Sequence, residues 1–309
     1  MDKKLHISVS PHFHAKVTTQ SIMLDVILAL LPTTIAGVLI FGVRSLAVIA
    51  VSVGFSVLSE FVFNKLAKKP MTIQDLSAVV TGLLLALTLP VNIALWEVAI
   101  GAIFAIVVVK GFFGGIGQNF ANPAITGRVF MLVAFGDVVS AKSFVGKGIV
   151  DTTASATPLA NMATAPTSMI DLLLGTHAGA IGEVCTVALL LGFVYLLIKK
   201  VITFHTPVVF IAVVFLLTLL ITKDVNTALA YSMSGGLFIG AIFMATDYAT
   251  TPTRPWGKVI FAVGCAVITV LIRMYGNLPE GVSYAILLMN ILTPYIDKWT
   301  EDKPFGGEA

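Results

Sequence analysis

Three stretches of this 309-residue chain gather the glycine, amide, hydroxyl and carboxylate groups that can take part in chemistry. The first, residues 114–124, reads GGIGQNFANPA, and its candidate residues are Gly115, Gly117, Asn119 and Asn122. Glycine lets the backbone approach a ligand closely, and amide side chains satisfy peptide groups that lipid cannot. The stretch is therefore either a tight connection or a re-entrant segment that lines the path of a cofactor or an ion.

The second stretch, residues 245–253, reads ATDYATTPT and adds a carboxylate and four threonine hydroxyls. Thr246 and Asp247 are its candidates, with Asp247 either a boundary residue in water or a ligand for an ion. The third stretch, residues 151–158, reads DTTASATP and occupies the longest gap between apolar runs. Its residue types alone predict no more than a polar turn outside the membrane.

Ionisable residues in or near apolar runs are further candidates, because charge is costly in lipid. They are Asp25, Glu60, Glu97, Lys110, Asp137 and Glu183. Most lie within a turn or two of the end of a run, where a side chain reaches water without any function. Glu60 lies deeper, and Lys65 in the same run is an available partner.

Metal and hydrolytic chemistry find little support in the sequence. His12 and His14, near His6, have no third and fourth ligand at the spacing of a zinc site. Cys185 and Cys265 each lie alone in an apolar run, which indicates packing and leaves open a metal site shared with another subunit. No G-x-S-x-G, Walker or H-E-x-x-H motif is present, which disfavours a hydrolase.

The elements that must position these residues are membrane helices. The chain is 57% apolar and 11% charged, and apolar runs of about 18 residues or more can cross a bilayer. Such runs predict an all-α polytopic membrane protein with about ten transmembrane helices and no cleavable signal peptide. We expect them near residues 22–43, 45–66, 76–89, 93–113, 127–141, 180–198, 207–222, 226–245, 257–275 and 281–296.

The lysines and arginines predict the orientation, because positively charged loops stay in the cytoplasm. With the N-terminus inside, five of the nineteen fall outside, namely Arg44, Lys142, Lys147, Lys223 and Arg273, and fourteen fall inside. The inner set includes Lys110 and Arg128. Both termini are thus predicted to be cytoplasmic, and the stretch at 151–158 extracytoplasmic.

An internal repeat divides the predicted helices into two sets of five. The third span of the first set reads SAVVTGLLLALTLP, and that of the second reads SMSGGLFIGAIFMATD. Because five is odd, the second set enters the membrane inverted, as in many transporters. The resulting segments are an N-terminal segment 1–21, a repeat 22–141, a loop 142–179, a repeat 180–296 and a tail 297–309.

Three motifs carry a resemblance to a known family. They are G-G-x-G-x-N-x-x-N-P-A at 114–124, S-G-G-L-x-x-G-A-x-F-M-A-T-D at 234–247 and D-x-x-x-x-A-T-P at 151–158. With the ten spans, they resemble the D subunit of the Rnf complexes, which is related to the B subunit of the sodium-translocating NADH:quinone reductase. The resemblance covers nearly the whole chain and implies a fold similar to the urea transporters.

The resemblance implies that FMN is joined through its phosphate to the hydroxyl of Thr157 by an exported flavin transferase. Asp151 then corresponds to the acidic residue of the transferase pattern and Ala156 to the alanine before the acceptor. The chain departs from the common pattern at Ala154-Ser155, where Ser or Thr followed by Gly is usual, although Ser155 keeps the small size. Thr152 and Thr153 are fallback acceptors.

The implied function is that of a membrane subunit of a redox-driven ion pump. Relatives relay electrons between reduced ferredoxin and NAD, with flavin and iron–sulfur centres in partner subunits, and couple this to movement of Na⁺ or H⁺ across the bacterial cytoplasmic membrane. The resemblance also implies a second, non-covalent flavin such as riboflavin. The alternatives are a cofactor-free, urea-channel-like solute transporter and the equivalent subunit of a sodium-translocating NADH:quinone reductase.

Overall fold

The computed structural model describes residues 17–136, 169–175, 177, 179–276 and 280–301, and every regular element in these residues is a helix. The first half contains α1 (Thr19–Phe41), α2 (Val43–Leu66), the short 3₁₀ helix η1 (Ile73–Asp75), α3 (Ser77–Leu87), α4 (Leu95–Ile103), which continues as the π-helix η2 (Phe104–Gly111), and α5 (Pro123–Ala134). The second half contains α8 (Met169–Leu174), α9 (Thr186–Ile198), α10 (His205–Thr222), α11 (Val225–Met233), α12 (Leu237–Ile239), which continues as the π-helix η4 (Gly240–Met244), α13 (Pro255–Tyr275) and α14 (Val282–Trp299).

The chain is an all-helical polytopic membrane protein. Four helices, α1, α2, α10 and α13, are long and apolar enough to cross a membrane, and α11 with α12 and η4 forms a fifth, bent candidate. The helices follow the ten predicted segments, and three of these segments differ from the prediction. The eighth is broken between α11 and α12. The fifth begins at Pro123, and the sixth begins at Thr186 rather than near residue 180.

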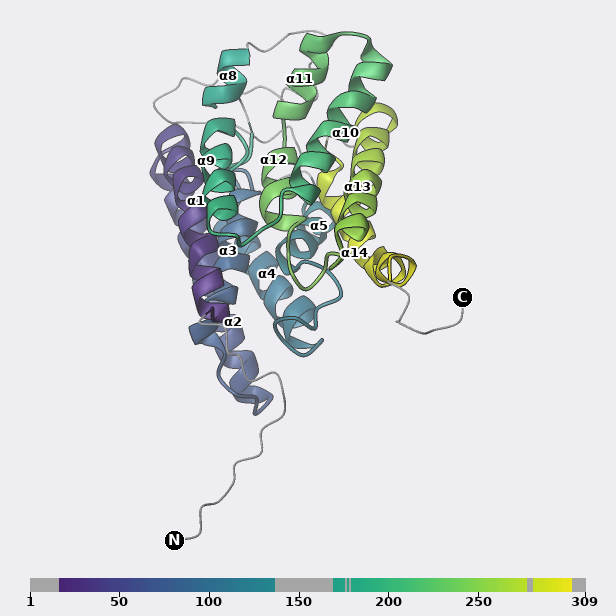
Figure 1. The fold of residues 1–309 in the computed structure, drawn as a ribbon. Helices are drawn as coiled ribbons and strands as arrows, with labels where there is room; N and C mark the ends of the chain where they lie inside the picture. The colour runs from purple at the N-terminus through teal and green to yellow at the C-terminus, as the bar shows by residue number, and fades with distance from the viewer. Residues whose placement is uncertain (1–16, 137–168, 176, 178, 277–279, 302–309) are drawn as a thin grey trace, which may run out of the picture.

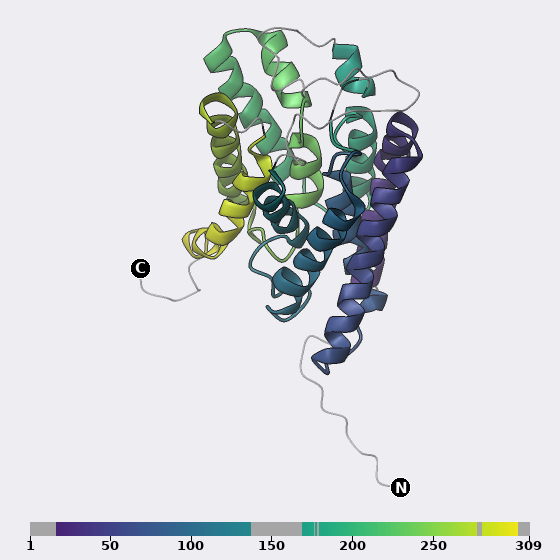
Figure 2. The ribbon, with the colours of Figure 1, turned by 180° about the vertical axis from the view of Figure 1, so that it is seen from behind.

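In Figure 1 the purple-to-blue helices of the first half lie mainly to the left and below, and the green-to-yellow helices α10, α13 and α14 lie to the right, while α9 of the second half lies beside α1. Figure 2 shows the same arrangement from behind. In the first half α2 packs on α3 and α4, and in the second α10 packs on α11 and α13. Contacts of α1 with α9 and of α5 with α14 join the halves. The α1–α9 crossing is tight, because a Cβ on Gly192 would lie 2.3 Å from the carbonyl oxygen of Ala29.

Helix α3 ends at Leu87, after eleven residues, inside the bundle. Its end needs hydrogen-bond partners, since the last carbonyls of a helix have none within it. The N–H of Gly182 donates to the Leu87 carbonyl at 2.7 Å, and that of Ile181 to the Leu89 carbonyl at 3.1 Å. Residues 180–183 therefore serve as a cap for α3 instead of beginning the next helix.

The chain beyond α3 is held by one guanidinium. Arg44, near the start of α2, donates to the carbonyls of Val91 at 2.9 Å, and of Asn92 and Ile93 at 3.3 Å each. This charge, which the sequence predicts to lie in an outer loop, thus binds backbone that no helix satisfies.

In the second half, the helical run of α11, α12 and η4 is broken by a sharp bend. The axis bends by 62° between α11 and α12, where Gly235 has a left-handed φ of 70°. Arg273 of α13 donates to the carbonyls of Tyr231 at 2.7 Å and Ser234 at 3.2 Å, and the Gly236 N–H donates to Glu280 at 2.8 Å. Side chains again bind the backbone groups that the break leaves free.

Two residues of the predicted inner loops lie instead in the interior. Arg128 of α5 is 2% exposed and Lys110 of η2 is 4% exposed. The sequence-based assignment of these two charges to loops was therefore wrong, because each is paired with buried carboxylates that the sequence alone does not bring near them.

Candidate functional site

A cavity lies where the two halves meet, between the start of α3 and the loops at 114–124 and 245–253. It encloses about 770 Å³, counting its open mouth. Its walls are mainly apolar, from α1, α3, α9 and η4. A few polar groups, those of Ser77, Thr81, Lys110, Asn119 and Asp247, face the same space. Such a lining suits a flat, largely apolar ligand with polar edges.

The two polar loops are tied to each other by asparagines. Asn122 caps α5, since its side chain accepts from the N–H groups of Ala124 and Ile125 at 3.0 and 3.2 Å. Its own N–H donates to the side chain of Asn290 at 3.2 Å. The Asn290 amide in turn donates to the carbonyl of Thr250 at 2.9 Å. This chain of bonds fixes the loop 114–124 of the first half against the loop 245–253 of the second.

Four predicted site residues line the cavity together: Asn119, Asn122, Thr246 and Asp247. Gly115 lines a neighbouring hollow, and Gly117 lines neither of the two. Gly115 and Gly117 have φ values of 108° and 82°, which residues with a side chain rarely adopt. These glycines shape the loop, while the amides and the Thr-Asp pair face the cavity.

Asp247 is held at the rim of the cavity by its own loop. The Thr250 hydroxyl donates to its carboxylate at 3.1 Å, and the Thr251 hydroxyl donates to its backbone carbonyl at 2.7 Å. Removal from water raises the pKa of the Asp247 carboxyl, and the bond from Thr250 opposes this rise. No cation is paired with Asp247 within the part of the chain that the structure describes.

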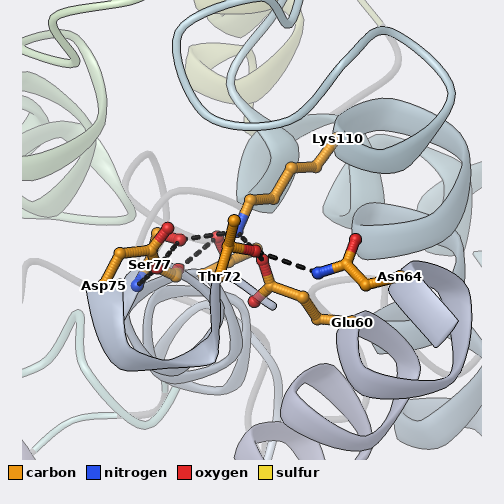
Figure 3. Close-up of polar contacts among 7 residues, drawn as sticks. Glu60, Asn64, Thr72, Asp75, Ser77 and Lys110 are labelled. Carbon is orange, nitrogen blue, oxygen red and sulfur yellow. Dashed lines mark hydrogen bonds and ion pairs between the residues drawn. The ribbon is translucent and has the colours of Figure 1, made fainter. Parts of the chain in front are cut away.

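A buried ion pair adjoins the cavity (Figure 3). The ammonium of Lys110 lies 2.7 Å from a carboxylate oxygen of Glu60, and both side chains are 5% exposed. Lys110 also donates to the Ser77 hydroxyl at 2.5 Å, and the Thr72 hydroxyl donates to the same oxygen of Glu60 at 2.7 Å. The second oxygen of Glu60 is buried and has no hydrogen-bond partner among the described residues. Lys65 is therefore not the partner of Glu60.

Lys110 links this ion pair to the cavity, because it lines both the cavity and the hollow that contains Glu60 and Gly115. Its position follows from η2, a π-helical stretch. Such stretches occur often at functional sites, and η4 of the second half borders the same cavity through Phe243.

A second buried charge cluster joins the halves away from the cavity. Arg128 of α5 donates to Glu183 at 2.8 Å and also to Glu280, whose other oxygen accepts from Gly236. Arg128 thus bridges the cap of α3, the start of α14 and the break before α12. A buried guanidinium is stable only when such partners are present.

Comparison with known proteins assigns the chain to a family. A sequence model described as the NQR2, RnfD, RnfE family matches residues 6–306. The chain belongs to this family. It is 43% identical over 308 residues to an Acetobacterium woodii protein, covering 98% of this chain and 95% of the relative. That relative is named as the D subunit of a Na⁺-translocating ferredoxin:NAD⁺ oxidoreductase complex.

Two further relatives extend the comparison. A Clostridium ljungdahlii protein, named as the D subunit of a proton-translocating ferredoxin:NAD⁺ oxidoreductase complex, is 41% identical over 316 residues, 97% of this chain and 96% of the relative. A Stutzerimonas stutzeri protein, named as the D subunit of an ion-translocating oxidoreductase complex, is 34% identical over 326 residues, 93% and 92% of the two chains. The names of the first two relatives differ in the ion.

The sequence-predicted flavin residues Asp151, Ser155, Ala156 and Thr157 lie outside the described residues, as do Asp137 and the three N-terminal histidines. The remaining ionisable candidates have structural partners. Asp25 accepts from Tyr195 at 2.8 Å, and Glu97 accepts from the Ala94 N–H at 3.3 Å.

We expect Lys110→Met to destabilise the protein by about 3–5 kcal/mol, because it leaves the Glu60 carboxylate buried and unpaired. Thermal unfolding in detergent measures the loss. Glu60→Gln/Lys110→Met should recover a large part of it, and Lys65→Met, at an exposed position on the same helix as Glu60, should change stability little. Equal melting temperatures for Lys110→Met and Lys65→Met would contradict the importance of the pair.

Proposed function

We propose that this chain is the D-type membrane subunit of an ion-translocating ferredoxin:NAD oxidoreductase complex in the bacterial cytoplasmic membrane. The observation that carries the proposal is its similarity, at 43% and 41% identity over nearly the whole chain, to two proteins whose names state that role. The chain then works with flavin- and iron–sulfur-bearing partner subunits and is not catalytic alone.

The first cofactor we propose is FMN, joined by a phosphoester to the hydroxyl of Thr157 in the segment 142–179. Support comes from the A-T-P motif at 156–158 within the resemblance described above, and from the placement of this loop outside the membrane by the charge count. FMN bound there would supply one-electron transfer, and Thr157 would fix its position.

We expect the denatured chain to show flavin fluorescence in a gel when it is co-expressed with a flavin transferase, and Thr157→Ala to abolish it. Thr152→Ala and Thr153→Ala are the matched controls and should keep the signal. Fluorescence that survives in Thr157→Ala would refute the assignment, and its absence from the unmodified chain beside an active transferase would favour the cofactor-free transporter.

The second cofactor we propose is a non-covalent flavin, such as riboflavin, in the cavity between the halves. The fit rests on its lining. Phe243, Leu84 and Ile22 provide apolar walls for a planar ring, and the amides and hydroxyls of Asn119 and Thr246 can bond its polar edges. Such groups hold and orient a ring and exclude water from it.

Filling the cavity should remove this flavin. We expect Ala249→Trp, whose new side chain would occupy the space, to lower the amount of flavin released from the purified, native protein by acid at least about tenfold, while the covalent signal at Thr157 stays. Ala67→Trp makes the same change at the exposed end of α2 and should release the normal amount. Normal release from Ala249→Trp would place the flavin elsewhere.

The same cavity adjoins the path that we propose for the coupling ion. Asp247 at its rim has a carboxylate without a paired cation among the described residues, and Lys110 leads from the cavity to Glu60. Asn119, Asn122, Thr246 and the loop around Gly115 and Gly117 would provide the remaining oxygens.

We expect Asp247→Asn to lower ion transport by the assembled complex at least about tenfold, because the amide keeps the shape but lacks the charge that a cation requires. Transport into inverted vesicles, driven by electron transfer from ferredoxin to NAD, measures the change. The exposed Asp224→Asn is the matched control. Unaltered transport with Asp247→Asn would remove Asp247 from the path.

We also propose that the fold is two inverted five-helix repeats, 22–141 and 180–296, with ten membrane passes and both termini cytoplasmic, as in the urea transporters. Equivalent contacts in the two halves support this. In the first half, Lys110 at the end of the fourth helical segment (α4–η2) binds Ser77 at the start of the third, α3. In the second half, Arg273 at the end of the fourth segment, α13, binds the carbonyls of Tyr231 and Ser234 in the third segment, α11–α12. The first helices of the two proposed repeats, α1 and α9, pack on each other, and so do the last, α5 and α14.

A further inference from the structure

Lys110 is the one basic residue among the described residues that line the cavity between the halves. Its counter-charge, Glu60, does not line the cavity and instead lies in the wall of the neighbouring hollow. The ammonium is therefore nearer to a ligand in the cavity than the carboxylate that pairs with it. Because the energy between charges falls with distance, such a ligand experiences a net positive charge at this wall.

The Lys110 ammonium has one N–H donor to spare. It donates to Glu60 at 2.7 Å and to the Ser77 hydroxyl at 2.5 Å, and the described residues accept no third bond from it. An ammonium group carries three donors on one nitrogen, so two bonds to fixed oxygens also fix the direction of the third. Lys110 and Ser77 both line the cavity, which leaves the third donor for an acceptor on its occupant.

Both anchors of this ammonium are themselves held in place (Figure 3). The Ser77 hydroxyl donates to the Asp75 carboxylate, which also accepts from the Ser77 N–H at 2.8 Å. The oxygen of Glu60 that binds the ammonium accepts from the Thr72 hydroxyl at 2.7 Å, and that hydroxyl accepts from the Asn64 amide at 3.0 Å. A satisfied buried network of this kind keeps a side chain in one position.

The lining suits the two unlike ends of a flavin ring. The pyrimidine end of the ring carries carbonyl oxygens and ring nitrogens that accept hydrogen bonds, and the dimethylbenzene end is apolar. Lys110 provides a charged donor for the first, and Leu84 and Phe243 provide apolar surface for the second. Hydrogen bonds and charge at the pyrimidine end are among the means by which a protein tunes a flavin.

We propose that Lys110 donates its third N–H to the pyrimidine end of the flavin in this cavity and raises the reduction potential of that flavin by its charge. Glu60 opposes the charge of Lys110 from the far side, so the two residues together set the potential. This inference rests on the second cofactor proposed above, and it names the residue that adjusts the affinity of that cofactor for electrons.

The test is the midpoint potential of the non-covalent flavin in the full chain carrying Thr157→Ala, which removes any covalent flavin from the signal. Titration with dithionite and redox mediators in detergent, followed by visible absorbance, measures it. We expect Lys110→Met/Glu60→Gln, which leaves no buried charge unpaired, to lower the ratio of reduced to oxidised flavin at a given potential at least about tenfold, or about 59 mV for a one-electron step.

Two further variants separate this effect from a structural defect. Glu60→Gln alone leaves the charge of Lys110 unopposed and should shift the potential in the other direction, by about threefold or more in the same ratio. It also serves as the test where the double variant fails to fold. Lys69→Met is the matched control, because Lys69 lines the hollow beside Glu60 but not the cavity, and its potential should stay within about threefold.

Opposite shifts in Glu60→Gln and the double variant, with Lys69→Met unchanged, would support the role of Lys110. A normal flavin content with shifts below about threefold in Glu60→Gln and in the double variant would overturn it and leave the second flavin in place. Shifts in the same direction, or an equal shift in Lys69→Met, would overturn it as well. If the Thr157→Ala chain releases no flavin in acid, both this inference and the second cofactor fail.

Discussion

The structure depends on hydrogen bonds that satisfy the backbone groups which helices leave free inside the bundle. In lipid an unbonded peptide group costs several kcal/mol, so a helix that stops or breaks at membrane depth must find partners within the protein. Arg44 and the segment 180–183 supply them at the end of α3, and Arg273 and Glu280 supply them at the break before α12. Glu280 is in turn fixed by Arg128, which also binds Glu183. The short and broken helices are therefore held by a small set of charged residues.

These breaks create the space in which the proposed chemistry takes place. Because α3 is short and α11 is bent, the loops at 114–124 and 245–253 reach inward, where Asn122 and Asn290 bind them together. The cavity between them is bordered by Lys110 of the π-helical stretch η2 and by Phe243 of η4, and Lys110 also pairs with Glu60. A flat cofactor in the cavity and an ion path past Glu60 can lie next to each other, because Lys110 lines the cavity and also pairs with the buried Glu60.

Much of this arrangement could be predicted from the sequence, and the missing part has a physical cause. Hydrophobic runs predicted the helical segments, and glycine, amide and carboxylate residues predicted the loops that line the cavity, including Asn122 and Asp247. The charge count misplaced Lys110 and Arg128, because a lysine or arginine in an apolar run looks the same whether it reaches water or a buried carboxylate. Their partners, Glu60, Glu183 and Glu280, are 50 or more residues distant, and no local pattern records such a pairing. The attachment of a flavin to Thr157 came from family resemblance alone, since a hydroxyl-rich turn has no signal of its own.

The proposal that this chain is a flavin-bearing redox subunit is tested most directly by the intact mass of the chain purified from its native membrane, followed by mapping of the modified peptide. The expected mass exceeds that of the sequence by one FMN less one water, and the modified peptide contains residues 151–158 with the added group on Thr157. An unmodified mass, from cells that contain an active flavin transferase, would contradict the proposal and leave a membrane protein of the same fold without a covalent cofactor.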